Sequence, residues 1–424
     1  MRHLSRRDWV RLLGGSAAAL WLPRDLAWAS PGPLPPAPAA PDEGYWSAVR
    51  DQFVMPKDLA VLNAANLCPS SGAALQTLYD ATRELDRQPS PAYREEMHEA
   101  KEVTRRQLAA FLGVTPEEIV ITRNTSESNN LVSSGLDLKA DDEVLLFSDN
   151  HPSNDTAWKE KGRRFGFGVK AVAAVSPHPG AEYYIEAFTS ALSPRTKVLA
   201  FTHLTSTVGD ILPARELCRL ARERDILTLV DGAQSFGLLD VNLRDMDPDF
   251  YSGSGHKWPC GPKEAGVLFV NRRSADRIWP SIYSAYPGAI GISKTFESFG
   301  QRDEPAIRAF GEALQLQSRV GRAAIERRAQ ELAQALMAGL RRLEGVTLWT
   351  HPDPARSSAV VSFRPGGLDP DRLTLALYEK DRIVCAKRPG EDRGGIRLSP
   401  HFYNSHAEVE RTLGAVERYL ASGV

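Results

Sequence analysis

A lysine stands in a glycine-rich loop between two segments with the apolar pattern of strands, residues 250–252 and 265–270. Lys257 directly follows the run Ser-Gly-Ser-Gly-His. Glycines let a backbone approach a ligand closely. Burial lowers the pKa of a lysine and makes its amine a nucleophile that can form a Schiff base. Most loop lysines are simply exposed, and Lys263 nearby offers the same chemistry. The loop alone therefore leaves both interpretations open.

A carboxylate follows a second apolar segment. Asp231 comes directly after the expected strand 227–230, so it points out of the carboxyl edge of a parallel sheet, where ligands bind in open α/β sheets. A carboxylate there can pair with the protonated ring nitrogen of pyridoxal 5′-phosphate (PLP), which keeps the ring an electron sink. An aspartate in this position can equally cap a helix.

Hydroxyl side chains follow a third apolar segment, residues 119–122. The run Arg-Asn-Thr-Ser-Glu-Ser-Asn at residues 123–129 leads into an expected helix. Hydroxyls and free backbone N–H groups at a helix N-terminus form an anion site. Taken alone, the run is more typical of a plain cap, with Asn124 or Thr125 capping and Glu127 completing a capping box.

The order and spacing of the three segments together resemble the class V aminotransferase family of fold-type I PLP enzymes. The resemblance covers roughly residues 60 to 420. That family includes cysteine desulfurases, selenocysteine lyases, kynureninase-like enzymes and isopenicillin N epimerases. The resemblance implies an α/β fold with a large, mainly parallel seven-stranded sheet, a small C-terminal α+β domain, PLP as cofactor and an amino acid as substrate.

The resemblance also implies a role for individual residues. Lys257 matches the lysine that binds PLP as a Schiff base, and Asp231 matches the partner of the pyridinium. His151 matches the residue that stacks on the ring, and Gln234 the residue beside the phenolic oxygen. Arg397 matches the arginine that binds the substrate α-carboxylate, a task that suits a planar guanidinium. The implied phosphate ligands are Thr125, Ser126, Ser254 and His256.

Several positions depart from the family pattern. Desulfurases need a cysteine on the loop before the arginine, but the loop 387–394 has none, and Cys385 lies in an expected strand where a thiol is normally inert. Ser206 replaces an asparagine near the cofactor, and we expect His203 to be a satisfied histidine at a strand end. Gln301 replaces a threonine in a segment that, in relatives, reaches the partner subunit's cofactor phosphate.

Three reactions are open to such a site. Reprotonation of the α-carbon on the opposite face gives epimerisation, reprotonation at the C4′ carbon of the cofactor gives transamination, and loss of a β-substituent gives lyase chemistry. We expect an epimerase-like or aminotransferase activity, with a PLP-dependent β-lyase (C–S lyase) as the alternative. A cysteine desulfurase or a non-catalytic PLP-fold binding protein ranks below these. Epimerisation requires a second acid/base, for which Tyr283, Tyr286 and Tyr403 are the candidates. The substrate side chain is left open.

Alternating apolar and amphipathic segments must position these residues. Short apolar strands between helices indicate a buried, mainly parallel sheet. Further strands are expected at 143–148, 169–175 and 197–203, and helices at 97–111, 213–224 and through residue 158. A large PLP-binding domain is predicted over 45–303, with an N-terminal segment able to pack on the second domain. That domain, 304–424, is expected to hold a long helix over 304–343, strands 346–350, 359–363 and 382–386, and helices 368–379 and 405–421.

The N-terminus has the pattern of a twin-arginine signal peptide. Arg6 and Arg7 precede a short apolar stretch, and Ala-Trp-Ala at residues 27–29 offers a cleavage site. Residues 30–44 are expected to form a Pro/Ala-rich linker. The pattern predicts the twin-arginine export machinery as a partner and a periplasmic or extracellular location. Whether residues 1–29 are cleaved or retained is left open.

Composition excludes some partners. The 424 residues include 52 Lys and Arg against 53 Asp and Glu, which gives no reason to expect nucleic acid, or a membrane after signal cleavage. The four cysteines are scattered without CxxC spacing, so we expect no metal site and no required disulfide. The resemblance implies a homodimer acting on a small amino acid substrate.

Overall fold

The computed structural model describes residues 32–390 and 392–424. The predicted signal peptide at residues 1–29 lies outside this described part of the chain. Among the described residues, no helix has both the length and the apolar character needed to span a bilayer.

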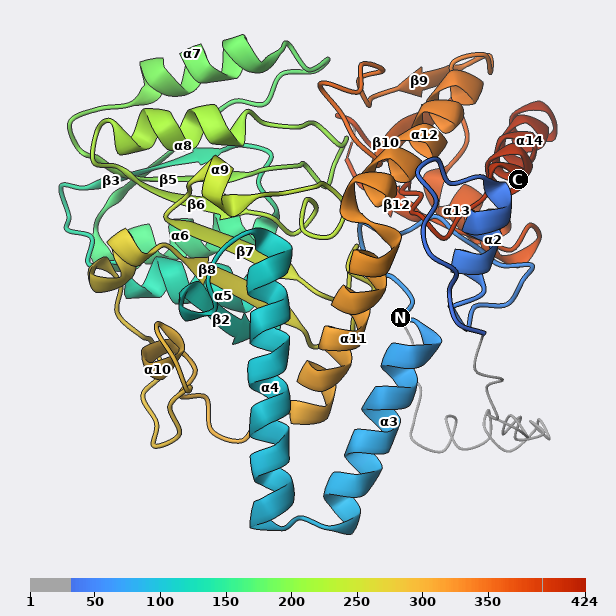
Figure 1. Cartoon of the computed structure of the whole chain (residues 1–424). Coiled ribbons are helices and arrows are strands. Elements are labelled where there is room, and N and C mark those ends of the chain that lie inside the picture. The colour runs from blue at the N-terminus through green and yellow to red at the C-terminus, as the bar shows by residue number, and fades with distance from the viewer. Residues whose placement is uncertain (1–31, 391) are drawn as a thin grey trace, which may run out of the picture.

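A seven-stranded sheet forms the larger part of the molecule (Figure 1). Its strand order is β2-β8-β7-β6-β5-β3-β4, and β8 alone runs antiparallel to its neighbours. The predicted fold class, a fold-type I α/β structure with a large, mainly parallel sheet, is thereby confirmed. The strands are β2 (Ile119–Thr122), β3 (Glu143–Phe147), β4 (Gly168–Val172), β5 (Thr196–Thr202), β6 (Leu227–Asp231), β7 (Phe250–Ser254) and β8 (Gly266–Val270).

Helices cover both faces of this sheet, which is why β2, β3, β6, β7 and β8 are buried along their whole length, whereas the edge strand β4 is largely exposed. In β3, Val144 and Leu146 pack in the same cluster as Trp158, whereas Leu145 and Phe147 belong to the cluster that contains Phe188. Figure 1 shows one pair of helices below the sheet and the other above it. The lower pair is α5 (Thr125–Gly135) and α6 (Pro152–Phe165), and the upper pair is α7 (Ala181–Ala191) and α8 (Ala214–Arg222).

A second, four-stranded antiparallel sheet with order β12-β13-β10-β9 lies in the C-terminal part. The N-terminal segment reaches this part, because β1 (Ala60–Val61) pairs in parallel with β11 (Ile383–Val384). The strands are β9 (Val346–Leu348), β10 (Val361–Pro365), β12 (Ala386–Arg388) and β13 (Gly395–Leu398), and the helices are α13 (Pro370–Glu379) and α14 (His406–Ser422).

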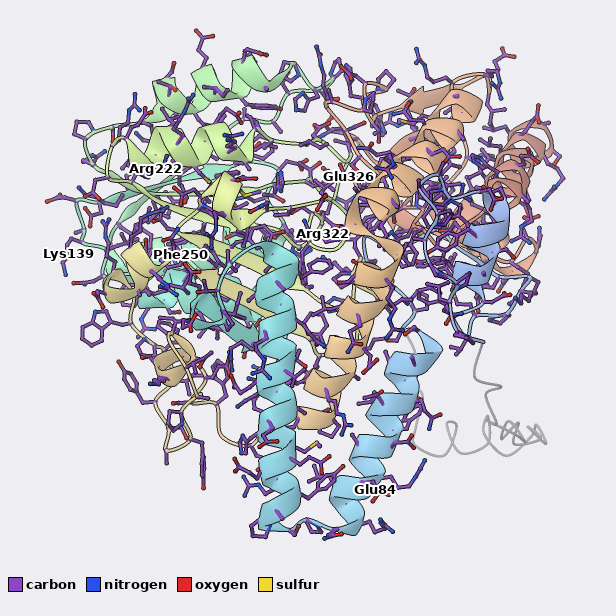
Figure 2. All side chains as sticks on the ribbon, in the orientation of Figure 1. Glu84, Lys139, Arg222, Phe250, Arg322 and Glu326 are labelled. Carbon is purple, nitrogen blue, oxygen red and sulfur yellow. The ribbon has the colours of Figure 1, made fainter. Side chains whose placement is uncertain are left out.

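The predicted helix over 304–343 is wrong as a single element. It is two helices, α11 (Glu304–Val320) and α12 (Arg322–Leu340), separated by Gly321 with φ 92°. A glycine can adopt this left-handed conformation without the clash that a Cβ would cause. Arg322 fixes the bend by donating to the carbonyls of Phe111 and Val241. Figure 2 places Arg322 and Glu326 near the junction of the two helices.

Other predicted boundaries also shift. The helix expected over 97–111 is α4 (Pro91–Leu112), because Ser90 caps it and proline suits its first turn. The strand expected over 382–386 is instead the two short strands β11 and β12, with Cys385 between them. Not predicted were the strands β1 and β13, the helix α7, and also α2 (Glu43–Arg50), α3 (Gly72–Arg87), α9 (Leu243–Met246), α10 (Ser293–Phe296) and the 3-10 helices η1 (Pro116–Glu118) and η2 (Arg272–Arg277).

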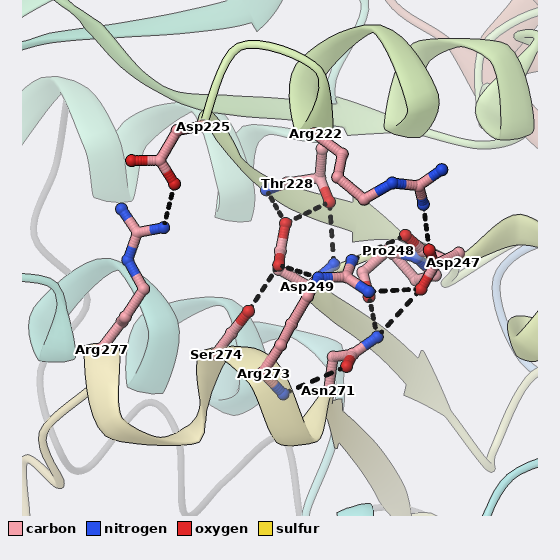
Figure 3. A network of polar contacts seen from close by, with 10 residues as sticks. All are labelled: Arg222, Asp225, Thr228, Asp247, Pro248, Asp249, Asn271, Arg273, Ser274 and Arg277. Atoms are coloured by element: carbon pink, nitrogen blue, oxygen red, sulfur yellow. Dashed lines mark hydrogen bonds and ion pairs between the residues drawn. The ribbon is translucent and has the colours of Figure 1, made fainter.

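A polar network closes the amino-terminal edge of the large sheet (Figure 3). Asp249, which precedes β7, accepts hydrogen bonds from the N–H (2.9 Å) and hydroxyl (3.0 Å) of Thr228 at the start of β6. Its other oxygen accepts from Arg273 (3.1 Å) and from Ser274 of η2. A buried carboxylate satisfied on both oxygens in this way fixes the strand register. The functional residues lie at the opposite, carboxyl edge.

Candidate active site

All the site residues predicted from the sequence line one cavity of about 590 Å³. Their backbone positions explain the convergence, because Asp231 ends β6, Ser254 ends β7, and Thr125 and His151 follow β2 and β3. The carboxyl ends of parallel strands meet at one edge of a sheet. The residues brought together are Thr125, Ser126, His151, Asp231, Gln234, Ser254, His256, Lys257 and Arg397.

Lys257 has the chemistry of a nucleophilic amine. Burial lowers its pKa from 10.5 to about 8, while nearby Asp231 opposes that shift and Arg397 adds to it. Lys263, the rival in the same loop, instead donates to the carbonyl of Cys68 (3.1 Å) and the hydroxyl of Ser70 (3.4 Å). It does not line the cavity. Of these two lysines, Lys257 is the one that lines the cavity.

Asp231 is held by groups that leave it facing the cavity. One carboxylate oxygen accepts from the backbone N–H of Ala233 (3.0 Å), and the other from the side-chain amide of Asn129 (2.9 Å). The side-chain amide oxygen of Asn129 accepts in turn from the hydroxyl of Ser252 (2.7 Å). Sequence reasoning missed Asn129, which reads as an ordinary polar helix residue. It is a positioning residue for Asp231.

Neutral donors gather at one end of the cavity. The N–H and hydroxyl of Thr125 contact the Ser254 hydroxyl at 2.9 and 2.8 Å, and Ser126 lies exposed in the next position. Asn124 caps α5 by accepting from the N–H of Glu127 (3.0 Å), as the plain-cap interpretation predicted, but the predicted capping box does not form, because Glu127 accepts from the N–H of Arg123 (2.6 Å) instead. This end of α5 combines hydroxyls with a helix N-terminus, which suits a phosphate.

His256 completes this end of the cavity. Burial, followed by the charge of Lys257, lowers the pKa of His256 to about 4, so its ring is neutral near pH 7. Its buried Nδ1 has no hydrogen-bond partner among the described residues. An unpaired buried nitrogen costs free energy unless a ligand supplies the missing contact.

His151 and Gln234 flank the middle of the cavity. His151 caps α6, because its Nδ1 accepts from the N–H of Ser153 (3.2 Å), and its ring stays exposed toward the cavity. Burial and then Lys257 lower the pKa of His151. Gln234 donates to the carbonyl of Ala65 (2.9 Å) and accepts from the indole of Trp258 (2.8 Å). One N–H of Gln234 remains for a ligand.

Arg397 forms the other end of the cavity, and it is buried rather than on the surface. It donates to the carbonyl of Ser206 (2.9 Å) and to Asn63 (3.5 Å), and its Nε has no partner among the described residues. Burial and the neighbouring Arg388 lower the pKa of Arg397 to about 10. A buried guanidinium that meets no carboxylate in the described chain is poised for an anionic ligand.

The tyrosines considered as a second acid/base do not reach this cavity. Tyr283 and Tyr286 are 74% and 64% exposed on the surface. Tyr403 is buried elsewhere and donates to the thiol of Cys68 at 3.5 Å. The expectation of a satisfied His203 is also wrong, because its buried Nδ1 lacks a partner among the described residues.

The four cysteines are free and buried. Cys385 was expected inside a strand, but it lies between β11 and β12 and contributes to the cavity wall. Burial raises its pKa from 9.0 to about 12, so the thiol stays protonated at neutral pH. A protonated thiol is a poor nucleophile. Elsewhere, the ligand atoms of Cys68, Cys260 and His401 lie within 4.8 Å of one another, a grouping that the scattered spacing did not suggest.

The cavity fits PLP on chemical grounds. It offers neutral hydroxyl and imidazole groups with an unsatisfied nitrogen at the phosphate end, a carboxylate and an exposed imidazole ring in the middle, and an amine of lowered pKa. Each matches one part of the cofactor: its phosphate, its ring with the ring nitrogen, and its aldehyde. Arg397 then remains for the substrate.

The comparisons with known proteins agree with this chemistry. Residues 65–412 match the family described as aminotransferase class-V. Isopenicillin N epimerase of Streptomyces clavuligerus is 30% identical over 388 residues, covering 88% of this chain and 98% of that protein. The isopenicillin N epimerase of Amycolatopsis lactamdurans is 31% identical over 393 residues, with the same coverage. A probable cysteine desulfurase of Methanothermobacter thermautotrophicus is 25% identical over 403 residues, again covering 88% and 98%.

A solved structure gives the same fold. A C-DES variant with glycine covalently linked to its PLP cofactor superposes with a TM-score of 0.80 at 24% identity, covering 89% of this chain and 99% of that one. At this sequence identity the structural similarity shows the fold alone. The family match and the two epimerase relatives show the family to which the chain belongs. The chain therefore belongs to the class V aminotransferases, enzymes of fold type I that take PLP as their cofactor.

Proposed function

We propose that the protein acts at the α-carbon of an amino acid or a close analogue, as an epimerase-like enzyme or an aminotransferase. The observation that carries this proposal is the convergence of Lys257, Asp231 and Arg397 on one cavity. An amine of lowered pKa, a ring-nitrogen partner and a carboxylate-binding guanidinium are the three groups that α-carbon chemistry with PLP requires.

The residues divide the work by position. When bound, PLP supplies an electron sink for the charge that develops at the α-carbon. Arg397 holds the substrate carboxylate and so fixes the orientation of the Cα–H bond. Lys257 takes or returns the α-proton, for which a pKa of about 8 is suitable near neutral pH. The donors at the phosphate end, which include Thr125 and Ser254, would hold the phosphate and so fix the position of the cofactor ring.

Product analysis tests the reaction type. The holoenzyme is incubated with single L- and D-amino acids, with and without a keto acid, in deuterated water. The expected result is inversion with deuterium entering at Cα, or keto-acid formation with loss of the α-hydrogen and deuterium exchange at Cα of the remaining amino acid. Release of sulfide, pyruvate and ammonia from cysteine or cystine without a keto-acid acceptor instead supports the alternative, a β-lyase. Absence of any α-proton exchange in a PLP-loaded protein overturns the proposal.

Sulfur transfer through a persulfide fits the site less well. It needs a cysteine that is a thiolate and can move toward the substrate. Cys385 is the cysteine in the cavity wall, and burial raises its pKa to about 12. The nearby charge of Arg397 only partly offsets that rise.

The pKa of Lys257 predicts how cofactor loading depends on pH. The deprotonated amine is the nucleophile, so loading of apoprotein accelerates as pH rises and levels off above about 8, rather than near 10.5. At pH 7 about one amine in ten is already reactive. Stopped-flow absorbance of apoprotein mixed with PLP measures the rate, and the Lys257→Ala protein reports the pH response of PLP binding alone. A midpoint above 10 would contradict the assignment.

We propose that the protein forms a homodimer. Trp279, Ile282, Tyr283 and Tyr286 expose large apolar surfaces on one segment, with exposed fractions from 45% to 74%. Such a concentration of exposed apolar side chains is typical of an interaction surface. The Gln301–Arg302 loop, for which the family resemblance implies contact with a partner's cofactor site, follows this segment. Sedimentation equilibrium tests the assembly, and a monomer at micromolar concentration would refute it.

We further propose export through the twin-arginine machinery. Arg6, Arg7 and the apolar stretch after them support this, together with a cofactor that is loaded into a folded protein. An export assay with Arg6→Lys plus Arg7→Lys tests the proposal, since undiminished export of the double variant would rule it out.

A further inference from the structure

A second arginine lies in the substrate end of the cavity and is not used by the proposed chemistry. Arg388 ends β12 and lines the cavity together with Arg397. Strand pairing places them on the same side of the small sheet, because Arg397 stands opposite Ala386 and Arg388 is two residues further along. The intervening Lys387 also borders the cavity, but its ammonium pairs with Asp371 on the other side of the strand.

Arg388 has no direct partner for its charge among the described residues. Its side chain is half-buried and makes no hydrogen bond or ion pair with the described residues. Asp149, the acid whose charge acts on Arg388, is already bonded to Arg393 (3.2 Å) and to the hydroxyl of Thr207. Lys387, by contrast, pairs with exposed Asp371 on the outside. Two guanidiniums, Arg388 and Arg397, therefore meet one cavity, and neither is paired with a carboxylate of the described residues 32–390 and 392–424.

Arg388 belongs to the substrate end rather than the phosphate end. Its charge lowers the pKa of Arg397 and of His151, and it acts on Asp149. The phosphate-end histidine, His256, instead responds to Lys257 and Lys263. The anion that Arg388 meets is therefore one carried by the substrate, beyond the α-carboxylate that Arg397 holds.

We propose that Arg388 binds a second acidic group on the substrate, and that the enzyme acts on amino acids with a carboxylate, or a similar oxyanion, in the side chain. This rests on the proposed function and sharpens it to a substrate class. A charged hydrogen bond between a guanidinium and a carboxylate, formed in a water-poor cavity, discriminates strongly against a neutral isostere.

Matched acid and amide ligands test the proposal. The holoenzyme is titrated with aspartate against asparagine, glutamate against glutamine, and 2-aminoadipate, each as both enantiomers, and the change in its visible cofactor band gives Kd. For wild type we expect at least one acid to bind about 10-fold more tightly than its amide. Arg388→Gln should weaken acid binding by about 10- to 100-fold and leave the amide within about threefold. Lys387→Gln, the adjacent control, should change neither.

Equal binding of acids and amides by wild type overturns the assignment, and this comparison needs no variant to fold. Equal weakening of both ligands in Arg388→Gln also overturns it, because that result indicates a general structural role. A band that shifts with neutral amino acids alone keeps the proposed function and removes the acidic substrate class. If the visible band of the PLP-loaded protein responds to no amino acid, both the proposed function and the acidic substrate class are wrong.

Discussion

Purified Lys257→Ala should lack the absorption band of the lysine-bound cofactor at roughly 410–430 nm, which wild type should show and lose on borohydride reduction. The residue supplies both the covalent link and the group that moves the α-proton. Loss of proton transfer alone costs about 10²- to 10⁴-fold in rate. We therefore expect turnover of any amino acid substrate to fall by at least about 10³-fold. PLP can still bind noncovalently, because the phosphate-end donors do not depend on this lysine.

Lys263→Gln is the matched control for this experiment. Both lysines lie in the same loop, and burial lowers the pKa of both, but Lys263 binds backbone and hydroxyl groups outside the cavity. The variant should keep the band, the borohydride-trapped mass adduct and activity within a few-fold. A band retained by Lys257→Ala and lost from Lys263→Gln would reverse the assignment.

The parts of the site that the sequence could predict share one origin. Asp231, Ser254 and Thr125 each follow or end an apolar strand, and parallel strands deliver their carboxyl ends to one edge. Local patterns thus specify where the cavity forms. The family resemblance then assigned Arg397, whose burial no local pattern indicates.

The missed residues depend on contacts between distant parts of the chain. Asn129 bonds to Asp231 across 102 positions, and nothing in the sequence of α5 marks that face. Arg388 was expected in a loop, whereas pairing of β12 with β13 turns it into the cavity. Helix α3 also escaped prediction, although its sequence is amphipathic; the residues that it buries are Gly72, Ala74 and Ala81, all of them small.

Asp231→Asn should reduce turnover by about 10²- to 10³-fold or more, with cofactor still bound. A fixed charge beside the ring nitrogen stabilises charge that develops during the reaction, and one such preorganised group is commonly worth that factor. Affinity for substrate should change little, because Arg397 is untouched. Steady-state kinetics therefore should show a fall in kcat at nearly constant KM.

The single variant has a structural side effect that must be separated from the chemical one. An amide at position 231 directs N–H groups at either Asn129 or the N–H of Ala233, each of which now donates to the carboxylate. A mismatched pair of buried donors costs about 1–3 kcal/mol of folding free energy. Some loss of thermal stability is therefore expected in Asp231→Asn whatever the role of the charge.

Exchanging the two side chains separates these effects. In the double variant Asn129→Asp plus Asp231→Asn, the amide at 231 can donate to the new carboxylate, which still accepts from Ser252, and the amide oxygen can accept from Ala233. Every hydrogen bond is kept while the charge moves one position away from the ring nitrogen. We expect near wild-type melting temperature, retained cofactor and turnover still depressed by at least about 10²-fold. Recovered turnover in the exchanged protein would mean that Asp231 serves packing, and that the ring nitrogen takes its proton from another group.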